Sequence, residues 1–184
     1  MRRLRRDEDL ARGIQYGDRN CLAALVERHH SLLLGFLYRM TGGDRALAED
    51  LVQETFVRVI HHISQYEYPR PFKAWLYRIA TNLARDYYKQ AEMRHTISMS
   101  EDVDAAVSDA PEDAVLLDIE GEVVASAMLR LPVPQRETLV LRYYQELSLA
   151  EIAEVQGVPV GTVKSRLSVG LGRLRELVLE REQN

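Results

Sequence analysis

Near the C-terminus, the stretch from Thr162 to Arg166 reads TVKSR and places two cations and two hydroxyls within five residues. Cations can meet the acceptors of guanine in the major groove of DNA, and hydroxyls can bond to bases or phosphates. These residue types favour binding to duplex DNA, although a helical hairpin with a solvated basic face would share them. The candidate contacts are Thr162, Lys164, Ser165, Arg166, Ser168, Val169 and Arg173.

Two short helical segments must position these side chains. Ser148 and Glu151 have the spacing of a capping box, which opens a first short helix that Gly157 closes. Pro159 suits the first turn of a last helix that continues to about Glu180. This pattern predicts a helix-turn-helix, in which the early residues of the second helix enter the major groove. The buried face of the last helix is expected to hold Val163, Leu167, Leu171 and Leu174.

Cations and aromatic rings also share one face of a predicted long helix over residues 71–90, preceded by a loop over 64–70. Cations can follow the phosphates of a single strand while rings stack on its bases. The alternative is a solvated helix face beside an ordinary loop. The exposed face would carry Arg78, Asn82, Arg85, Tyr88 and Lys89, and the core face Phe72, Trp75, Leu76, Ile79, Ala80, Leu83 and Tyr87.

A third set of polar residues lies opposite the apolar stripe of a predicted helix that Asp44 can cap. Such residues could be catalytic acids, metal ligands or a docking surface for a basic helix, or simply a solvated face. The set is Glu49, Asp50, Gln53 and Glu54, and the expected buried stripe is Ala48, Leu51, Val52, Thr55, Phe56, Val59, Ile60 and Ile63.

A di-iron bundle enzyme is a further alternative, because Glu27–His30 and Glu92–His95 both read Glu-x-x-His. Ligands of such a centre must point into the bundle, whereas Glu49 and Glu54 are predicted to point away from the apolar stripe. We therefore expect no metal centre and no cofactor. Cys21 is expected to be a small buried residue, and His29, His61 and His62 surface or hydrogen-bonded histidines.

Charge is segregated along the 184 residues of the chain. Residues 1–95 hold 16 basic and 12 acidic residues, 96–122 hold none and nine, and 123–184 hold eight and seven, which together give the net charge of −4. Exposed charges are screened beyond about 8 to 10 Å, so binding to a polyanion depends on the local patch. The acidic total therefore does not exclude nucleic acid as a partner.

Apolar residues recur at spacings of three and four almost throughout, which predicts an all-α fold. The acidic stretch 96–114 lacks aromatic residues and is expected to be a flexible linker. We thus expect helical domains at 1–95 and 115–184, the second containing the helix-turn-helix. A single cysteine fits a reducing compartment, the cytoplasm, and no apolar run approaches the roughly 18 residues that membrane insertion needs.

Taken in order, these segments resemble an extracytoplasmic-function sigma factor of bacterial RNA polymerase. The resemblance rests on AEDLVQETFVRV, then AWLYRIATNLARDYY, the acidic linker, and LPVPQRETLVLRYYQELSLAEIAEVQGVPVGTVKSRL, and it covers about residues 15–180. It implies a protein without catalysis of its own that binds core polymerase, recognises a promoter and opens its strands. It also implies an anti-sigma factor as a further partner.

The resemblance assigns a role to each set of residues. Glu49, Asp50, Gln53 and Glu54 would dock on the coiled coil of the polymerase clamp, and the second domain would face the flap. The loop would receive a flipped base, and the long helix would read the −10 region, with contacts from Ser64, Gln65, Tyr66, Tyr68, Arg70, Trp75, Arg78, Asn82, Arg85 and Lys89. The helix-turn-helix would read the −35 region, with Arg142 of the preceding helix on a backbone phosphate.

Val169 and Gly170 depart from the family's pattern, which continues with basic residues and alanine after KSRL. Gly170 is expected to cost the helix up to about 1 kcal/mol relative to alanine. Val169 would give an apolar contact where a cation would hold phosphate or guanine. A free-standing helix-turn-helix regulator is the remaining alternative, and it would bind duplex DNA without polymerase.

Overall fold

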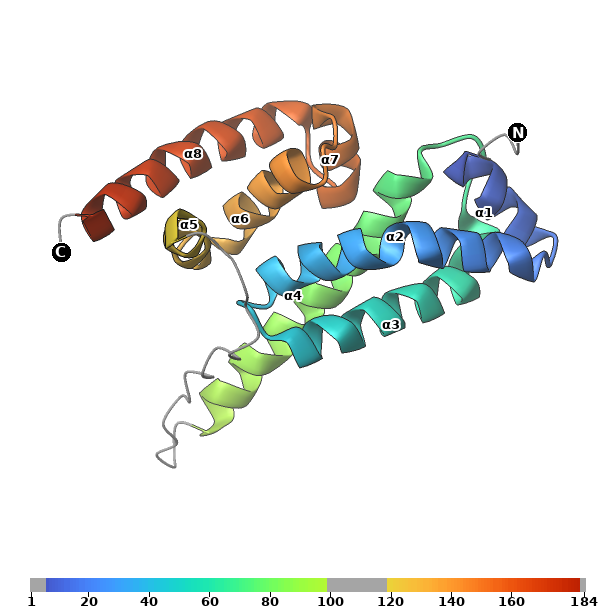
Figure 1. The fold of residues 1–184 in the computed structure, drawn as a ribbon, viewed down its shortest axis with the longest axis horizontal. Coiled ribbons are helices and arrows are strands. Elements are labelled where there is room, and N and C mark those ends of the chain that lie inside the picture. The colour runs from blue at the N-terminus through green and yellow to red at the C-terminus, as the bar shows by residue number, and fades with distance from the viewer. Residues whose placement is uncertain (1–5, 99–118, 183–184) are drawn as a thin grey trace.

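The computed structural model describes residues 6–98 and 119–182, with side chains for 6–89 and 123–180. Within these residues the chain forms eight α-helices and no strand, which confirms the predicted all-α class (Figure 1). The helices are α1 (Asp7–Gln15), α2 (Arg19–Met40), α3 (Arg45–His62), α4 (Phe72–Ser98), α5 (Ile119–Leu129), α6 (Val133–Leu139), α7 (Leu149–Gln156) and α8 (Val160–Glu182), with a 3-10 turn η1 (Ile63–Gln65) and a π-helical turn η2 (Val140–Tyr144).

The first two connections of the N-terminal part are set by local capping. Asp18 accepts a hydrogen bond from the Asn20 amide and starts α2, and Asp44 accepts one from the Leu47 amide and starts α3, both at 2.9 Å. Each carboxylate satisfies a backbone donor that the helix itself leaves unpaired. The predicted cap at Asp44 is therefore confirmed.

The predicted apolar stripes form most of the core between α2, α3 and α4, with two exceptions. Ile60 is 47% exposed and Tyr87 is 36% exposed, so their assignment to the buried faces was wrong. Conversely, Tyr77 was not predicted to be buried, yet it is fully covered and packs edge-on against Phe36 with 5.2 Å between ring centroids. Tyr77 is covered because the second domain also packs on α4.

Helix α1 was not predicted, although Leu10, Ala11 and Ile14 have the three- and four-residue spacing of a buried helical face. It packs on α2 so closely that a Cβ at Gly13 would lie 2.5 Å from the Cys21 sulfur. Cys21 itself is buried, as expected. Glycine at position 13 thus allows α1 to lie directly on the start of α2.

The helix-turn-helix forms as predicted. Ser148 accepts from the Glu151 amide and Glu151 accepts from the Ser148 amide, which completes the capping box, and Gly157 ends α7 in the left-handed conformation with φ of 65°. Val163 is buried, and Leu167 and Leu174 are partly buried. Leu171 is 42% exposed, so its predicted burial was wrong.

Helix α4 continues to Ser98, beyond the predicted end at residue 90, so the start of the expected linker is helical. The rest of that linker, 99–114, lies outside the described residues. In Figure 1, the helices α5–α8 lie along one side of the layer formed by α2 and α4. Helix α7 packs on α4, and α6 and η2 pack on α2.

Gly170 is buried where α8 crosses α6, and an added Cβ would lie 3.4 Å from Gln135 Cβ and from Leu139 Cδ1. That distance is an ordinary van der Waals contact, so one methyl group fits. A Cβ at Gly172 would have no neighbour within 4 Å. The two glycines therefore share a helix but differ in the space around them.

We expect Gly170→Ala and Gly172→Ala each to raise the free energy of unfolding by up to about 1 kcal/mol, because alanine has the higher helix propensity. Gly170→Leu should lower it by about 1–3 kcal/mol through overpacking against α6, whereas Gly172→Leu should not. Urea unfolding of the four variants measures both effects. Equal stability of the two leucine variants would contradict the close packing at Gly170.

Candidate nucleic-acid interface

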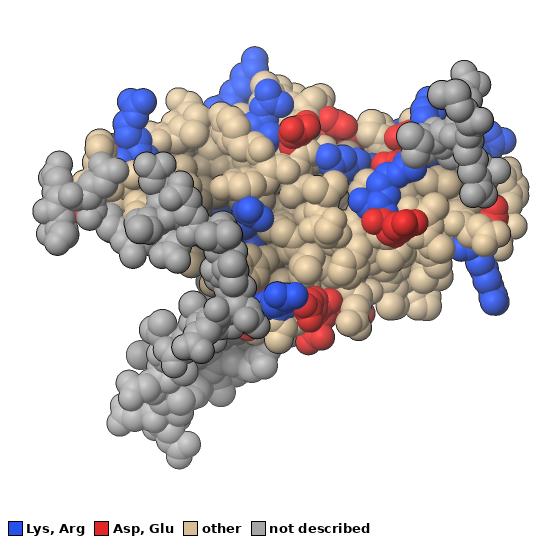
Figure 2. Space-filling model, viewed as in Figure 1, with Lys and Arg blue, Asp and Glu red and all other residues tan. Residues whose placement is uncertain are grey.

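The second helix of the helix-turn-helix presents polar side chains to solvent. Lys164, Ser165, Ser168 and Arg173 are exposed, and Val169 is 45% exposed beside them. Val163 on the opposite face is buried against α7 and anchors the helix. On the face drawn in Figure 2, basic side chains project from the edge formed by α8. The predicted contacts of the last helix thus lie on one accessible surface.

Two of the predicted −35 contacts already have partners within the protein. Arg166 donates from Nη1 to Oε1 of Gln156 over 2.8 Å, and the Gln156 amide donates to the Thr138 hydroxyl over 2.8 Å. Arg142 donates from Nη1 to the Leu147 carbonyl over 2.9 Å. These contacts orient the two guanidinium groups, and each group keeps further N–H donors. Thr162 is half-buried at the start of the helix.

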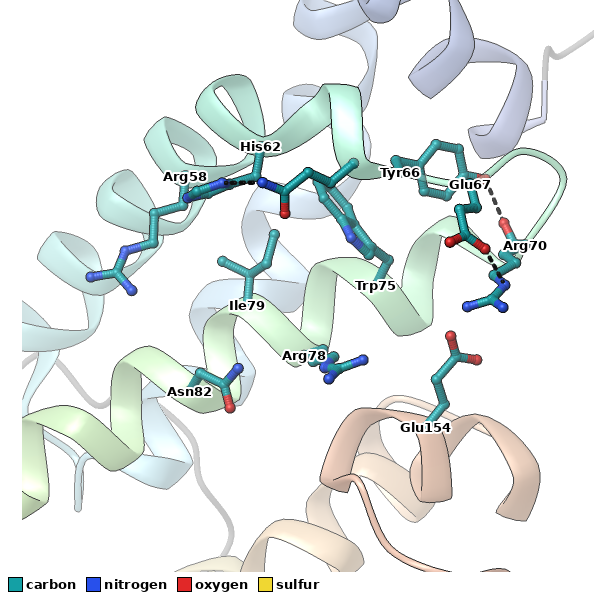
Figure 3. A pocket seen from close by; sticks show the side chains of 11 residues that line it. Arg58, His62, Tyr66, Glu67, Arg70, Trp75, Arg78, Ile79, Asn82 and Glu154 are labelled. Carbon is teal, nitrogen blue, oxygen red and sulfur yellow. Dashed lines mark hydrogen bonds and ion pairs between the residues drawn. The ribbon is translucent and has the colours of Figure 1, made fainter.

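A pocket of about 450 Å³ lies between the end of α3, the following loop and α4. Figure 3 shows the side chains that surround it, which come from both domains. Its lining joins six predicted −10 contacts with other residues that the sequence did not single out for this role. The lining residues are Arg58, His62, Gln65, Tyr66, Glu67, Arg70, Trp75, Arg78, Ile79, Asn82 and Glu154.

Some of the cations around this pocket form ion pairs, and others do not. Arg58 is paired with Glu54 at 2.9 Å, and Arg70 with Glu67 at 3.1 Å, in both cases on the exposed surface. Arg78 and Asn82 are exposed and make no hydrogen bond or ion pair with other described side chains. Arg78 and Asn82 are consequently the polar groups most available to a ligand in the pocket.

The loop residues fall into two groups. Tyr66 is 3% exposed and packs edge-on against Trp75 with 5.6 Å between ring centroids, while its hydroxyl donates to the Arg70 carbonyl. Burial raises the pKa of Tyr66 to about 12, so this phenol remains a donor. Tyr66 therefore forms a wall of the pocket and offers no open ring face. The predicted contacts Ser64, Gln65, Tyr68 and Arg70, and Lys89 on α4, are exposed.

Arg85 of α4 does not point freely to solvent as predicted. Its guanidinium makes two hydrogen bonds, of 3.0 and 2.8 Å, to the carboxylate of Glu137 on α6. The Arg85 side chain is 30% exposed and the Glu137 side chain is fully buried. Burial raises the pKa of Glu137, and the charge of Arg85 opposes that rise. A predicted DNA contact is thus engaged across the boundary between the two domains.

Further polar contacts join the domains around this pair. Gln145 is 3% exposed, and its side chain accepts from the Tyr77 hydroxyl and donates to the Leu32 carbonyl. Lys73 donates to the Gln145 carbonyl over 2.5 Å. Figure 3 shows Glu154 rising from α7 towards Arg70 and Arg78 on the other side of the pocket. The second domain therefore covers part of the face that α4 would present to DNA.

The acidic face of α3 is only partly free. Glu49 accepts from Arg45 at 3.0 Å and Glu54 from Arg58 at 2.9 Å, in pairs four residues apart on the same helix. Asp50 and Gln53 are exposed and have no such partner among the described side chains. Exposed Val57 lies on the same helix, at 44% exposure. This surface combines acidic, amide and apolar groups.

Among the residues with described side chains, no group of three or more His, Cys, Asp or Glu could hold a metal ion. Glu92 and His95 of the second Glu-x-x-His pattern lie outside those residues. Helices in the described part of the chain are too short or too polar to cross a membrane.

The architecture of two helical domains, the second with a helix-turn-helix, is that of the sigma-70 class of transcription factors. The family model for Sigma-70 region 2 matches residues 25–94, and that for Sigma-70 region 4 matches residues 122–174. The chain is 37% identical to the ECF RNA polymerase sigma factor SigW of Bacillus subtilis, over 89% of this chain and 91% of that protein. This chain therefore belongs to the extracytoplasmic-function sigma factors, as its sequence motifs indicated.

Other relatives agree. SigL of Mycobacterium tuberculosis is 34% identical, over 84% of this chain and 86% of that protein. Among solved structures, CnrH in complex with the cytosolic domain of CnrY superposes with a TM-score of 0.70 at 28% identity, covering 94% of this chain and 96% of that one. RpoE of Bartonella quintana in complex with the anti-sigma factor NepR gives 0.65 at 26% identity, with 84% and 96% covered.

We expect Arg85→Ala to separate the two domains, because it leaves the buried Glu137 carboxylate without its cation. Removing one partner of a buried ion pair costs about 3–5 kcal/mol, and water can relieve that cost only if α6 moves away from α4. The radius of gyration from small-angle X-ray scattering should increase. Arg78→Ala, on the same helix but without a partner, is the matched control and should leave it unchanged. An unchanged radius for Arg85→Ala would show that the pair does not hold the domains together.

Proposed function

We propose that this sigma factor binds core RNA polymerase and directs initiation at promoters that carry both a −10 and a −35 element. The observation that carries the proposal is that each domain exposes basic residues, Arg78 and Lys89 on α4 and Lys164 and Arg173 on α8, in a chain whose halves match sigma-70 regions 2 and 4 in that order. A regulator that reads duplex DNA alone would need only the helix-turn-helix. The basic residues of the first domain are accounted for if the protein also binds single-stranded DNA.

The face of α3 is the proposed docking site on the clamp coiled coil of the polymerase. Asp50 and Gln53 are its exposed polar groups without partners among the described side chains, and Val57 adds apolar area. Glu49 and Glu54 would exchange their exposed pairs with Arg45 and Arg58 for contacts with the clamp. Such exposed pairs contribute only about 0–1 kcal/mol, so exchanging them costs little. The second domain would face the flap.

The pocket beside the loop 64–70 is the proposed site for a base flipped from the non-template strand. A flipped base costs a few kcal/mol of lost stacking, which contacts in a pocket must offset. Trp75 is half-buried at the pocket and can contact the base, while Arg78 and Asn82 are free to bind phosphate and base edges. Arg85 could join them only after Glu137 releases it, so opening of the two domains would precede strand binding.

The exposed face of α8 is the proposed −35 reader, with Lys164 and Ser165 nearest to the groove and Arg142 towards the backbone. Cytoplasmic residence and control by an anti-sigma factor complete the proposal. The solved relatives CnrH and RpoE are bound to the cytosolic domain of CnrY and to the anti-sigma factor NepR, respectively, which supports such control.

Reconstitution with core polymerase tests the proposal. The chain should bind core polymerase and support transcription from promoters recovered by sequencing the DNA bound to the reconstituted holoenzyme. Those promoters should share two conserved elements, and deletion of either should abolish transcription. A chain that shifts duplex DNA unaided but does not bind core polymerase would instead be a free-standing regulator.

Val169→Arg should strengthen binding to the −35 element, because it adds one cation to the exposed groove face of α8. One more phosphate contact should steepen the dependence of log K on log salt by about one unit. Leu179→Arg adds the same charge to an equally exposed position near the far end of α8 and should leave the slope unchanged. Titration of −35 duplex at several salt concentrations measures both, and a slope unaffected by Val169→Arg would place position 169 away from the DNA.

A further inference from the structure

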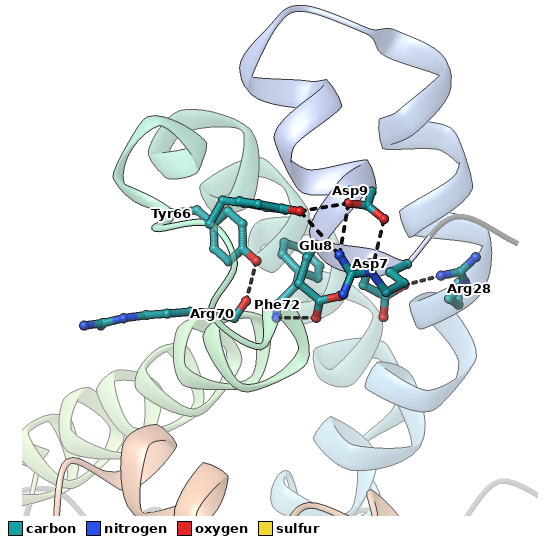
Figure 4. Close-up of polar contacts among 9 residues, drawn as sticks. Asp7, Glu8, Asp9, Arg28, Tyr66, Arg70 and Phe72 are labelled. Atoms are coloured by element: carbon teal, nitrogen blue, oxygen red, sulfur yellow. Dashed lines mark hydrogen bonds and ion pairs between the residues drawn. The ribbon is translucent and has the colours of Figure 1, made fainter.

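Helix α1 lies against the loop beside the proposed base pocket, and it contacts residues before, within and after that loop. The loop 64–70 connects α3 with α4, and the turn η1 at its start is its regular structure. Flexible connections lose conformational entropy when they adopt one shape, so other contacts must hold them. Figure 4 shows that α1 supplies polar side chains on the side away from the second domain.

Gln15, the last residue of α1, holds the beginning of the loop. Its side-chain amide donates to the Ile63 carbonyl and to the Tyr66 carbonyl, each over 2.8 Å. One amide group thus binds two backbone carbonyls, that of Ile63, which also accepts from the Tyr66 amide in η1, and that of Tyr66. This contact sets the backbone at Tyr66, whose ring forms a wall of the pocket against Trp75.

Three further residues of α1 contact Tyr68 in the loop and Phe72 after it. The Tyr68 hydroxyl donates to Asp9 over 3.3 Å, and the Arg12 guanidinium lies 4.9 Å from the centre of the Tyr68 ring. Glu8 accepts from the Phe72 amide over 3.3 Å at the first residue of α4. A carboxylate at that position satisfies a free amide and interacts favourably with the helix dipole.

Helix α1 is itself held firmly on α2. Asp7 contacts Arg28 and the buried His29, the latter at 2.8 Å, and Gly13 permits close contact with Cys21. Burial pushes the pKa of Asp7 upwards, but hydrogen bonds and charges from His29 and Arg28 outweigh it and hold the pKa below its usual range. Asp7 therefore remains ionised as an anchor, and α1 provides a fixed support for the loop.

We propose that Gln15 is a positioning residue for base discrimination: through the Ile63 and Tyr66 carbonyls it sets the shape of the pocket that selects the flipped base. Gln15 touches no DNA in this arrangement, so it would act on selectivity and not on the affinity for duplex DNA or polymerase. The inference rests on the proposed function, since it assumes that the loop receives a base.

The test uses holoenzyme reconstituted with core polymerase and fork-junction DNA whose single non-template strand carries each of the four bases in turn at each −10 position. Fluorescence anisotropy gives the affinity ratio between the best and worst base. Gln15→Met removes both donors and should lower that ratio by about tenfold at one position, while the affinity for DNA without a −10 single strand stays unchanged. Gln15→Lys restores donors for the two carbonyls and should recover most of the ratio.

The ratio is independent of the fraction of active protein, so it separates positioning from a general loss of folded chain. If Gln15→Met binds all four bases more weakly with the ratio unchanged, or behaves as the original chain does, the proposal is wrong. If the original chain shows no discrimination at any position, the proposed base reading fails instead. Should Gln15→Met not fold, Arg12→Gln removes an exposed cation that lies over the Tyr16 and Tyr68 rings, and it must lower the same ratio.

Discussion

A fully buried carboxylate, Glu137 of α6, constrains how the two domains of this protein can be arranged. Arg85 of α4 compensates its charge across the domain boundary with two hydrogen bonds. An ionised group without such a partner is costly to bury, so loss of the pair would weaken the packing of α6 beside α4. While α6 lies beside α4 as in this structure, Arg85 is bound to Glu137 and is therefore not available to DNA.

The second domain also restricts access of DNA to the pocket beside α4. Glu154 of α7 faces Arg70 and Arg78 there, so a carboxylate occupies space that a DNA phosphate would enter. Across the pocket from Glu154, Tyr66 and Trp75 form a wall. Helix α1 supports this wall through the hydrogen bond from Gln15 to the Tyr66 carbonyl. The second domain, which covers the pocket, could thus move away while α1, which supports the wall, stays in place.

An acidic chain can act as a DNA-binding protein because its charges are separated along the sequence. Acidic residues concentrate in 96–122 and on α3, whereas the exposed start of α8 carries Lys164 without an acidic neighbour in sequence. A reader of this kind need not bind tightly alone, since attachment through a polymerase would raise its effective concentration at the promoter. At Gly170 in α8, the close approach of α6 excludes a large side chain but leaves room for a methyl group.

The amino-acid sequence alone determined the features that depend on neighbours within a few residues. The all-α class, the cap at Asp44, the capping box at Ser148 and the helix-turn-helix were all predictable, and so was the family, because its motifs are contiguous segments. Tertiary structure decided which groups on those helices are free. Tyr77 is buried and donates a hydrogen bond to Gln145, which lies 68 residues away. Arg85 is paired with Glu137, which lies 52 residues away. Helical periodicity describes one helix at a time, so it cannot show that a second domain covers its exposed face.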